Sequence, residues 1–161
     1  MEQGTIFKFH NDLDTDQIIA SQYLLLPNLD EMKGHTFESL DPDFAKKVKP
    51  GDFVVGGENF GCGSSREQAP EIIKALGIQC VIAKSFARIF FRNSINNGLL
   101  LIEQPELHEH VKEGDEVTVV MNQHVDHQGK QYPIASLPEN LMDILRAGGL
   151  VKAMRKLNGL D

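Results

Sequence analysis

The feature that most constrains the fold is a series of short apolar runs that alternate with helical segments. The apolar runs lie at residues 52–56, 80–83 and 99–102. The segments between them, at about 65–76 and 86–96, have helical signals and are followed by Gly77 and Gly98, as helix ends commonly are. Strand, helix, strand, helix, strand in this order predicts an α/β fold with a largely parallel core sheet.

Further elements are expected on both sides of this core. A first strand is favoured at 4–9, and strands at 116–120 and 130–133 are expected to form an antiparallel hairpin, with Gln128-Gly129 at the turn. Short helices are expected at 29–33 and 43–47, and a closing helix at 139–146 that Gly148-Gly149 interrupts before it resumes over 150–157. A length of 161 residues suits a single domain over 1–161.

The stretch from 21 to 50 is rich in turn residues and has weak structure of its own. Long excursions of this kind are often lids or recognition loops, although a segment that becomes ordered at an interface is an equally fair interpretation. We therefore expect a flexible, substrate-recognising loop at about 21–40.

Composition and charge exclude several classes of function. The chain is 41% hydrophobic and 24% charged, and no stretch reaches the roughly 18 apolar residues that a membrane span needs. The first residues show no signal-peptide pattern, so we expect a cytoplasmic protein. A net charge of −7 gives no support to nucleic-acid binding. The same charge would repel dicarboxylates, so a site for them needs a local cation.

Two cysteines, Cys62 and Cys80, are the only thiols in the chain. Their spacing matches neither a zinc knuckle nor a redox pair, and two thiols cannot hold a four-thiolate cluster. We therefore expect no metal in this chain. Cys80 lies in an apolar run and is expected in the core, whereas Cys62 lies in a glycine loop where it can meet a ligand.

The segment from Gly61 to Glu67, with the sequence Gly-Cys-Gly-Ser-Ser-Arg-Glu, is the strongest candidate for chemistry. Its glycines allow the backbone to approach a ligand, and the predicted helix start and Arg66 would favour an anion. An equally plausible interpretation is purely structural: Ser64 and Glu67 fit a capping box. The segment is neither a Walker loop nor a dinucleotide fingerprint, which makes nucleotide binding the weaker alternative.

Three motifs resemble, in order and spacing, the swivelling domain of the aconitase superfamily, as found in the small subunits of isopropylmalate isomerase and homoaconitase. The resemblance is close from the first strand to about Ile102 and looser beyond it. The motifs are Asp14-Thr15-Asp16-Gln17-Ile18-Ile19, Gly57-Glu58-Asn59-Phe60-Gly61-Cys62-Gly63-Ser64-Ser65-Arg66-Glu67 and Ala83-Lys84-Ser85-Phe86-Ala87-Arg88-Ile89.

The resemblance implies a swivelling β/β/α domain with a mixed, largely parallel core sheet, flanking helices and additional antiparallel strands. It implies a hydro-lyase that is active only with a large subunit, which would carry a [4Fe–4S] cluster and form a heterodimer or heterotetramer with this chain. The reaction would be the isomerisation of 2-isopropylmalate and 3-isopropylmalate by dehydration and rehydration, in leucine biosynthesis.

The resemblance also assigns roles to particular residues. Ser64, as an alkoxide, would remove a proton from the carbon beside a carboxylate. Ser65 and Arg66 would hold the substrate carboxylate in a loop that includes Gly63 and Cys62. Asp16 is a possible orienting residue, although turn and cap formation is the simpler interpretation of this side chain. Lys84 and Arg88 flank a predicted helix start and could face the site, although a structural contact is the simpler interpretation of each.

One departure from the family pattern concerns the substrate. Homoaconitase-like small subunits read Tyr-Leu-Arg-Thr where this chain reads Tyr23-Leu24-Leu25-Leu26. Leu24, Leu25 and Leu26 would lie against an alkyl group and could not pair with an additional carboxylate. Isopropylmalate, citraconate and 2,3-dimethylmalate stay open as substrates, and homoaconitase activity is disfavoured. A non-catalytic dicarboxylate-binding module is the alternative from another class, and an RNA-binding role has no support from the charge.

Overall fold

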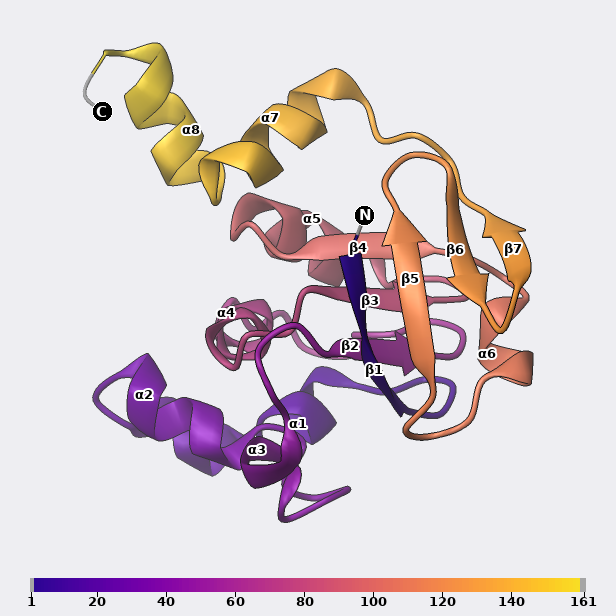
Figure 1. Cartoon of the computed structure of the whole chain (residues 1–161). Coiled ribbons are helices and arrows are strands. Elements are labelled where there is room, and N and C mark those ends of the chain that lie inside the picture. The colour runs from indigo at the N-terminus through magenta and orange to yellow at the C-terminus, as the bar shows by residue number, and fades with distance from the viewer. Residues whose placement is uncertain (1, 160–161) are drawn as a thin grey trace.

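The computed structural model describes residues 2–159, and its centre is a mixed sheet (Figure 1). Seven strands are ordered β4-β3-β2-β1-β5-β6-β7. Their bounds are β1 Glu2–Lys8, β2 Phe53–Gly56, β3 Cys80–Ala83, β4 Leu100–Glu103, β5 Glu116–Val120, β6 His124–His127 and β7 Lys130–Pro133. This arrangement confirms the predicted fold class, with a parallel core and additional antiparallel strands.

Strands β1 to β4 form the parallel half of the sheet. Every residue of β2 and β3 is buried, as expected of parallel strands that are covered on both faces. Apolar side chains on one face pack against helices, and those on the other face, among them Ile6, Val55 and Ile82, pack against β5 to β7. The sequence of continuous apolar runs therefore accounts for the central strands.

Strands β5 to β7 form the antiparallel half, which turns across β2 to β4 in Figure 1. Burial in β5 alternates from residue to residue, as in a strand with one buried face. The predicted hairpin partners were wrong, because β7 pairs with β6, and β5 lies between β1 and β6. His124 and His127 make β6 look polar, and only Val125 and His127 face the core.

Helices cover the parallel half and extend from the end of the chain. The longer ones are α4 Gln68–Ala75, α5 Arg88–Asn96, α7 Glu139–Ala147 and α8 Leu150–Leu157. The short ones are α1 Thr15–Ile18, α2 Leu29–Met32, α3 Phe44–Lys47 and α6 Leu107–His110. The break between α7 and α8 falls at Gly148 and Gly149 as predicted, whereas α6 was not predicted. None of the helices described over 2–159 is long and apolar enough to cross a membrane.

The segment predicted as a loop at about 21–40 contains short helical turns. The 3-10 helices η1 Ser21–Leu25 and η2 Lys33–His35 flank α2. Met32 and Phe37 are buried in the core cluster that α4 and α5 also join, so they anchor the segment to the body. The flexibility of the loop at about 21–40 stays a prediction.

The parallel strands determine where a site can form. Strands β1, β2 and β3 run in the same direction, so the loops that follow them emerge at the same edge of the sheet. These are the loops at 9–14, 57–67 and 84–87. Ligands of α/β proteins commonly bind at this carboxyl edge. All three matching motifs of the sequence therefore meet in one place.

Candidate active site

Backbone contacts hold the three loops at the carboxyl edge together. Isolated bridges join Asp14 to Cys62 and Phe60 to Phe86. The amide of Thr15 donates to the carbonyl of Cys62 at 2.9 Å, and the hydroxyl of Thr15 donates to the carbonyl of Ser64 at 2.7 Å. The glycine loop is therefore attached to the first loop on both sides of Gly63.

Gly61 allows the glycine loop to pass close to α5. Its φ is +84°, and a Cβ added there would lie 2.2 Å from Cγ of Phe90. The ring of Phe90 in turn packs near Phe60, with ring centroids 5.6 Å apart. No other residue type fits both the backbone angle and the space, so packing alone requires a glycine at position 61.

A hollow of about 330 Å³ lies between the glycine loop and the start of α5. Three of the predicted substrate-binding residues, Gly63, Ser65 and Arg66, lie in its wall together with the predicted catalytic residue, Ser64. The remaining lining residues come from neighbouring segments: Thr15, Gly61, Ala87, Arg88, Ile89, Phe90 and Asn93. The predicted site thus forms a concave surface, to which α5 and its N-cap, Ala87, contribute five of the eleven lining residues.

The predicted helix start at Ser64 was wrong. Helix α4 begins at Gln68, and its N-cap, Glu67, has no side-chain capping hydrogen bond. The capping box that Ser64 and Glu67 suggested is absent, because Thr15 holds the Ser64 carbonyl and the chain stays irregular until α4 begins at Gln68. Helix amides therefore do not surround Ser64 in the way the sequence suggested.

The helix that faces the hollow is α5. Its N-cap, Ala87, offers no side-chain acceptor to the first amides, and the first turn contains no acidic residue. The residues from Ala87 to Phe90 all line the hollow, so the positive end of the α5 dipole adjoins it. Arg88 also lies there, although the sequence had suggested a structural contact. The third matching motif, at 83–89, was the signal that could have identified it.

Arg66 is directed at the first loop. Its guanidinium Nη1 donates to Oδ1 of Asp16 at 3.0 Å and to the carbonyl of Ile19 at 2.6 Å. The Arg66 side chain is 14% exposed, against 67% for Asp16. Asp16 thus orients Arg66 in this structure, and its neighbour Asp14 is the residue that caps α1, through a capping box with Gln17. Two contacts at one nitrogen leave other guanidinium donors for a ligand.

The two serines present exposed hydroxyl groups. Ser64 has no side-chain hydrogen bond to any of residues 2–159, and Thr15 holds only its backbone carbonyl. The hydroxyl of Ser65 accepts from Nδ2 of Asn93 at 3.5 Å, the outer limit of a hydrogen bond. Ser64 is therefore a fixed backbone position with a hydroxyl that is available to a ligand.

The cysteines take different places. Cys62 is half-buried in the glycine loop and does not line the hollow, and burial, reinforced by Asp14 and Asp12, raises the pKa of its thiol. Cys80 is buried in β3, as predicted, and burial strongly raises its pKa. Residues 2–159 contain no group of three or more histidine, cysteine or acidic side chains that could hold a metal ion.

The predicted specificity residues lie outside the hollow of this chain. Leu24 and Leu26 are partly buried and pack against the core, whereas Leu25 is 90% exposed. Their segment begins just after Ile19, whose carbonyl binds Arg66. Of the three leucines, Leu25 is the one with a side chain free to touch a ligand.

Comparisons with known proteins agree with the place of these motifs. The family model of the aconitase C-terminal domain matches residues 12–107, which include all three motifs and both serines. The fold and the site define a domain of this class.

Close relatives narrow the class further. The 3-isopropylmalate dehydratase small subunit of Lachnospira eligens is 65% identical, over 98% of this chain and 96% of that protein. The isopropylmalate/citramalate isomerase small subunit of Methanocaldococcus jannaschii is 49% identical, over 96% of this chain and 94% of that one. The crystal structure of 3-isopropylmalate dehydratase from the same archaeon matches with a TM-score of 0.91 and 43% identity, over 97% of this chain and 94% of that chain. The chain belongs to the family of 3-isopropylmalate dehydratase small subunits.

Proposed function

We propose that this chain supplies the proton-transferring and carboxylate-binding half of an active site that isomerises 2-isopropylmalate and 3-isopropylmalate. The observation that carries the proposal is the hydroxyl of Ser64, which is exposed and unpaired on a loop whose backbone is fixed. A buried or capped serine would support a structural interpretation instead. The family of the chain and the names of its relatives support the reaction.

Carboxylate binding is the first task of these residues. The substrate is an anion, and the chain has a net charge of −7, so local positive charge must overcome a general repulsion. Arg66, Arg88 and the first amides of α5 surround the hollow with such charge. Ser65 adds a hydroxyl donor at the same wall. A carboxylate of the substrate would lie between the glycine loop and α5.

Proton transfer is the second task. Ser64, as an alkoxide, would take the proton from the carbon beside the carboxylate in the dehydration and become a hydroxyl, and this hydroxyl would return a proton in the rehydration. A serine hydroxyl is a very weak base, so the alkoxide needs stabilisation by nearby positive charge. Arg66 is held by Asp16 and the Ile19 carbonyl, which fixes where that charge lies relative to Ser64.

The third part of the site is expected on another chain. The described residues offer no metal-binding group, and Cys62 and Cys80 lie in separate places, so the donor set of this chain does not fit a four-thiolate cluster. The [4Fe–4S] cluster is expected on the large subunit, where it would act as a Lewis acid toward the leaving hydroxyl. The cytoplasm is the expected location of the assembled enzyme.

The substrate class follows from the exposed Leu25. An apolar side chain favours an alkyl substituent and offers no partner to an additional carboxylate. Isopropylmalate and smaller alkylmalates such as citramalate are both compatible, since aliphatic pockets separate them by only about 1–3 kcal/mol per methylene. The name of the archaeal relative, which combines isopropylmalate and citramalate, supports testing both.

The test is reconstitution. The chain is mixed with the cluster-bearing large subunit from the same organism, and the alkene diacid is followed by its absorbance with 2-isopropylmalate or citramalate as substrate. We expect turnover from the pair, none from either chain alone, and weak binding of dicarboxylates by this chain alone. Absence of turnover with an active-cluster partner contradicts the proposal. Tight binding of dicarboxylates by the isolated chain would favour a binding module.

A further inference from the structure

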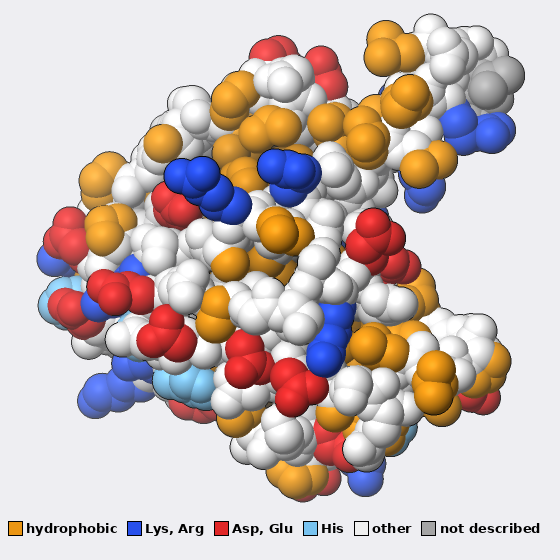
Figure 2. All heavy atoms as spheres, turned by 180° about the vertical axis from the view of Figure 1, so that it is seen from behind, with side chains coloured by type: hydrophobic (Ala, Val, Ile, Leu, Met, Phe, Trp, Pro, Cys, Tyr) orange, Lys and Arg blue, Asp and Glu red, His pale blue; other side chains and the backbone are white. Residues whose placement is uncertain are grey.

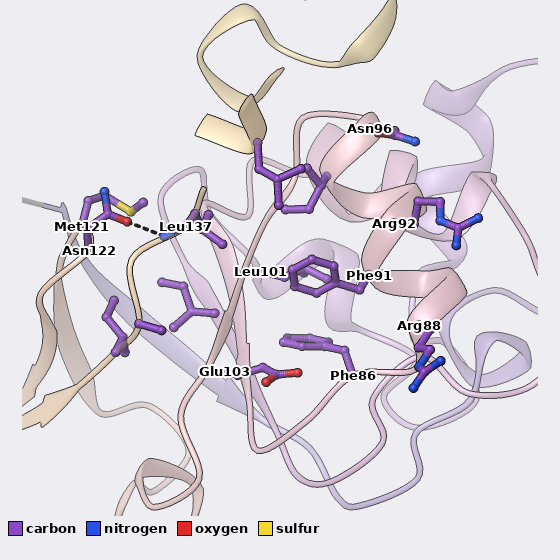
Figure 3. A pocket seen from close by; sticks show the side chains of 15 residues that line it. Phe86, Arg88, Phe91, Arg92, Asn96, Leu101, Glu103, Met121, Asn122 and Leu137 are labelled. Carbon is purple, nitrogen blue, oxygen red and sulfur yellow. Dashed lines mark hydrogen bonds between the residues drawn. The ribbon is translucent and has the colours of Figure 1, made fainter. Parts of the chain in front are cut away.

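A second, mostly apolar hollow lies on the other side of α5 from the proposed site. It has a volume of about 570 Å³ and lies among α5, β4, the end of β5 and the segment that leads into α7 (Figure 3). We call it the α5 groove. Its apolar wall is formed mainly by Phe86, Phe91, Leu101, Met121, Leu137 and Leu141.

Charged side chains flank the α5 groove on one side. Arg88 and Arg92 lie one turn apart on α5, and both point outward along the same edge in Figure 3. Glu103 lies at the end of β4, near Phe86. On the face of the molecule that Figure 2 shows, blue side chains lie beside a continuous orange area close to the projecting C-terminal helices. The α5 groove thus combines an apolar wall with a basic edge.

The two arginines have no partner in the part of the chain that the structure describes. Arg88 and Arg92 are exposed, and neither forms a hydrogen bond or ion pair with any of residues 2–159. The chain carries 23 acidic and 16 basic residues, so carboxylates are plentiful elsewhere on its surface. Two such arginines beside partly exposed aromatic and aliphatic side chains are typical of a protein-binding surface.

The α5 groove is continuous with the proposed active site. Arg88 lines both the groove and the hollow of Ser64, so a protein that closes over Ser64 reaches the groove as well. This continuity points to the large subunit as the occupant. The basic edge complements acidic side chains, and the apolar wall complements aliphatic or aromatic ones.

We propose that the α5 groove binds a segment of the large subunit that carries apolar side chains flanked by carboxylates. The apolar side chains enter between Phe91 and Leu137, and the carboxylates pair with Arg88 and Arg92. This contact places the large subunit over Ser64, because Arg88 borders both hollows. The inference rests on the proposed function and specifies where the partner binds.

Two substitutions separate the groove from the catalytic hollow. Arg92→Glu reverses the charge at a residue that lines the groove alone, and Ala135→Trp fills the groove from an exposed position without removing a core side chain. Lys46→Glu is the matched control, because Lys46 is an exposed residue on α3 and the change alters the net charge by the same amount. Thermal denaturation verifies that each variant is folded.

The measurement is the affinity of each variant for the purified, cluster-loaded large subunit, by calorimetry or by titration of turnover. We expect Arg92→Glu to raise Kd at least tenfold at low ionic strength and less in high salt. Ala135→Trp should raise Kd at least tenfold at either salt concentration, and Lys46→Glu should change it less than twofold. Maximal turnover at saturating large subunit should stay within twofold of wild type, since Ser64 and Arg66 are intact.

The alternative outcomes are distinct. Wild-type affinity in both groove variants would overturn the inference and leave the proposed function standing. A change in self-association of the isolated chain, with affinity for the large subunit unaffected, would assign the groove to a second copy and overturn it too. Failure of the wild-type chain to bind or activate the large subunit would overturn the proposed function together with the inference.

Discussion

Arg66 donates a hydrogen bond to the backbone carbonyl of Ile19 at 2.6 Å. This contact connects the serine loop, which is the part of the glycine loop that contains Ser64 and Ser65, to the chain just before the leucines at 24–26. The same nitrogen donates to Asp16 at 3.0 Å. A residue expected to bind substrate therefore also holds in place the chain that leads to Leu25. In the proposed function, chemistry and substrate choice would be coupled through one guanidinium.

Removal of the Asp16 carboxylate charge tests this orienting role. In Asp16→Asn, Arg66 keeps its hydrogen bond to the Ile19 carbonyl but loses its ion pair. The value of kcat/KM of the reconstituted enzyme should then fall by up to about 100-fold, because the guanidinium is misplaced. Stability should change by at most about 1 kcal/mol, since Asp16 is largely exposed. Asp30→Asn removes an exposed ion pair with Lys33 as a control and should leave kinetics unchanged. Equal effects of both substitutions would contradict the orienting role.

Leu25 provides a test of substrate choice. Leu25→Arg places a cation at a position that is 90% exposed, so the fold should be unaffected. The ratio of kcat/KM values should shift toward malates with an additional carboxylate and away from isopropylmalate. Leu24→Arg is the matched comparison: Leu24 packs against the core, and its loss should cost about 1–3 kcal/mol of stability. An unchanged substrate ratio in Leu25→Arg would place the specificity determinant elsewhere.

The thiol of Cys62 provides a pH-dependent test. Burial and the nearby carboxylates raise its pKa, so its thiolate fraction at pH 7 should lie below that of a free cysteine. Alkylation by iodoacetamide, followed by mass spectrometry in a Cys80→Ala background, should be slow at pH 7. Its rate should rise with a midpoint above the ordinary value of about 8.5. The denatured chain is the control and should show the ordinary midpoint. A native midpoint below it would indicate an activated thiol.

The sequence predicted the parallel core well, because the signal there is local. The runs at 80–83 and 116–120 coincide with β3 and β5, and Gly77 and Gly148 have the positive φ expected at helix ends. Apolar runs of this length become buried strands whichever segments of the chain pack around them. The strand β6 was missed because its polar residues become compatible with a strand only through pairing with β5 and β7.

The site was predicted in part, for a similar reason. The motifs located Ser64, Ser65 and Arg66, which do line one hollow. The capping box at Ser64 and Glu67 was wrong because Thr15, a residue 49 positions away, binds the Ser64 carbonyl. The contribution of α5 was also missed, since Arg88 and Asn93 reach the serines only through the parallel order of β1, β2 and β3. Contacts between distant segments are not visible in local patterns.

The most direct test of the central claim is the turnover of a Ser64→Ala variant reconstituted with the cluster-bearing large subunit. Because the Ser64 hydroxyl has no partner among residues 2–159, stability should stay within about 0.5 kcal/mol of wild type. Thr118→Ala, which removes a hydroxyl on β5 outside the hollow, is the control. We predict an assembled complex whose turnover is lost while its large-subunit affinity is retained. Wild-type turnover in the Ser64→Ala complex would contradict the assignment of Ser64 as the proton-transferring residue.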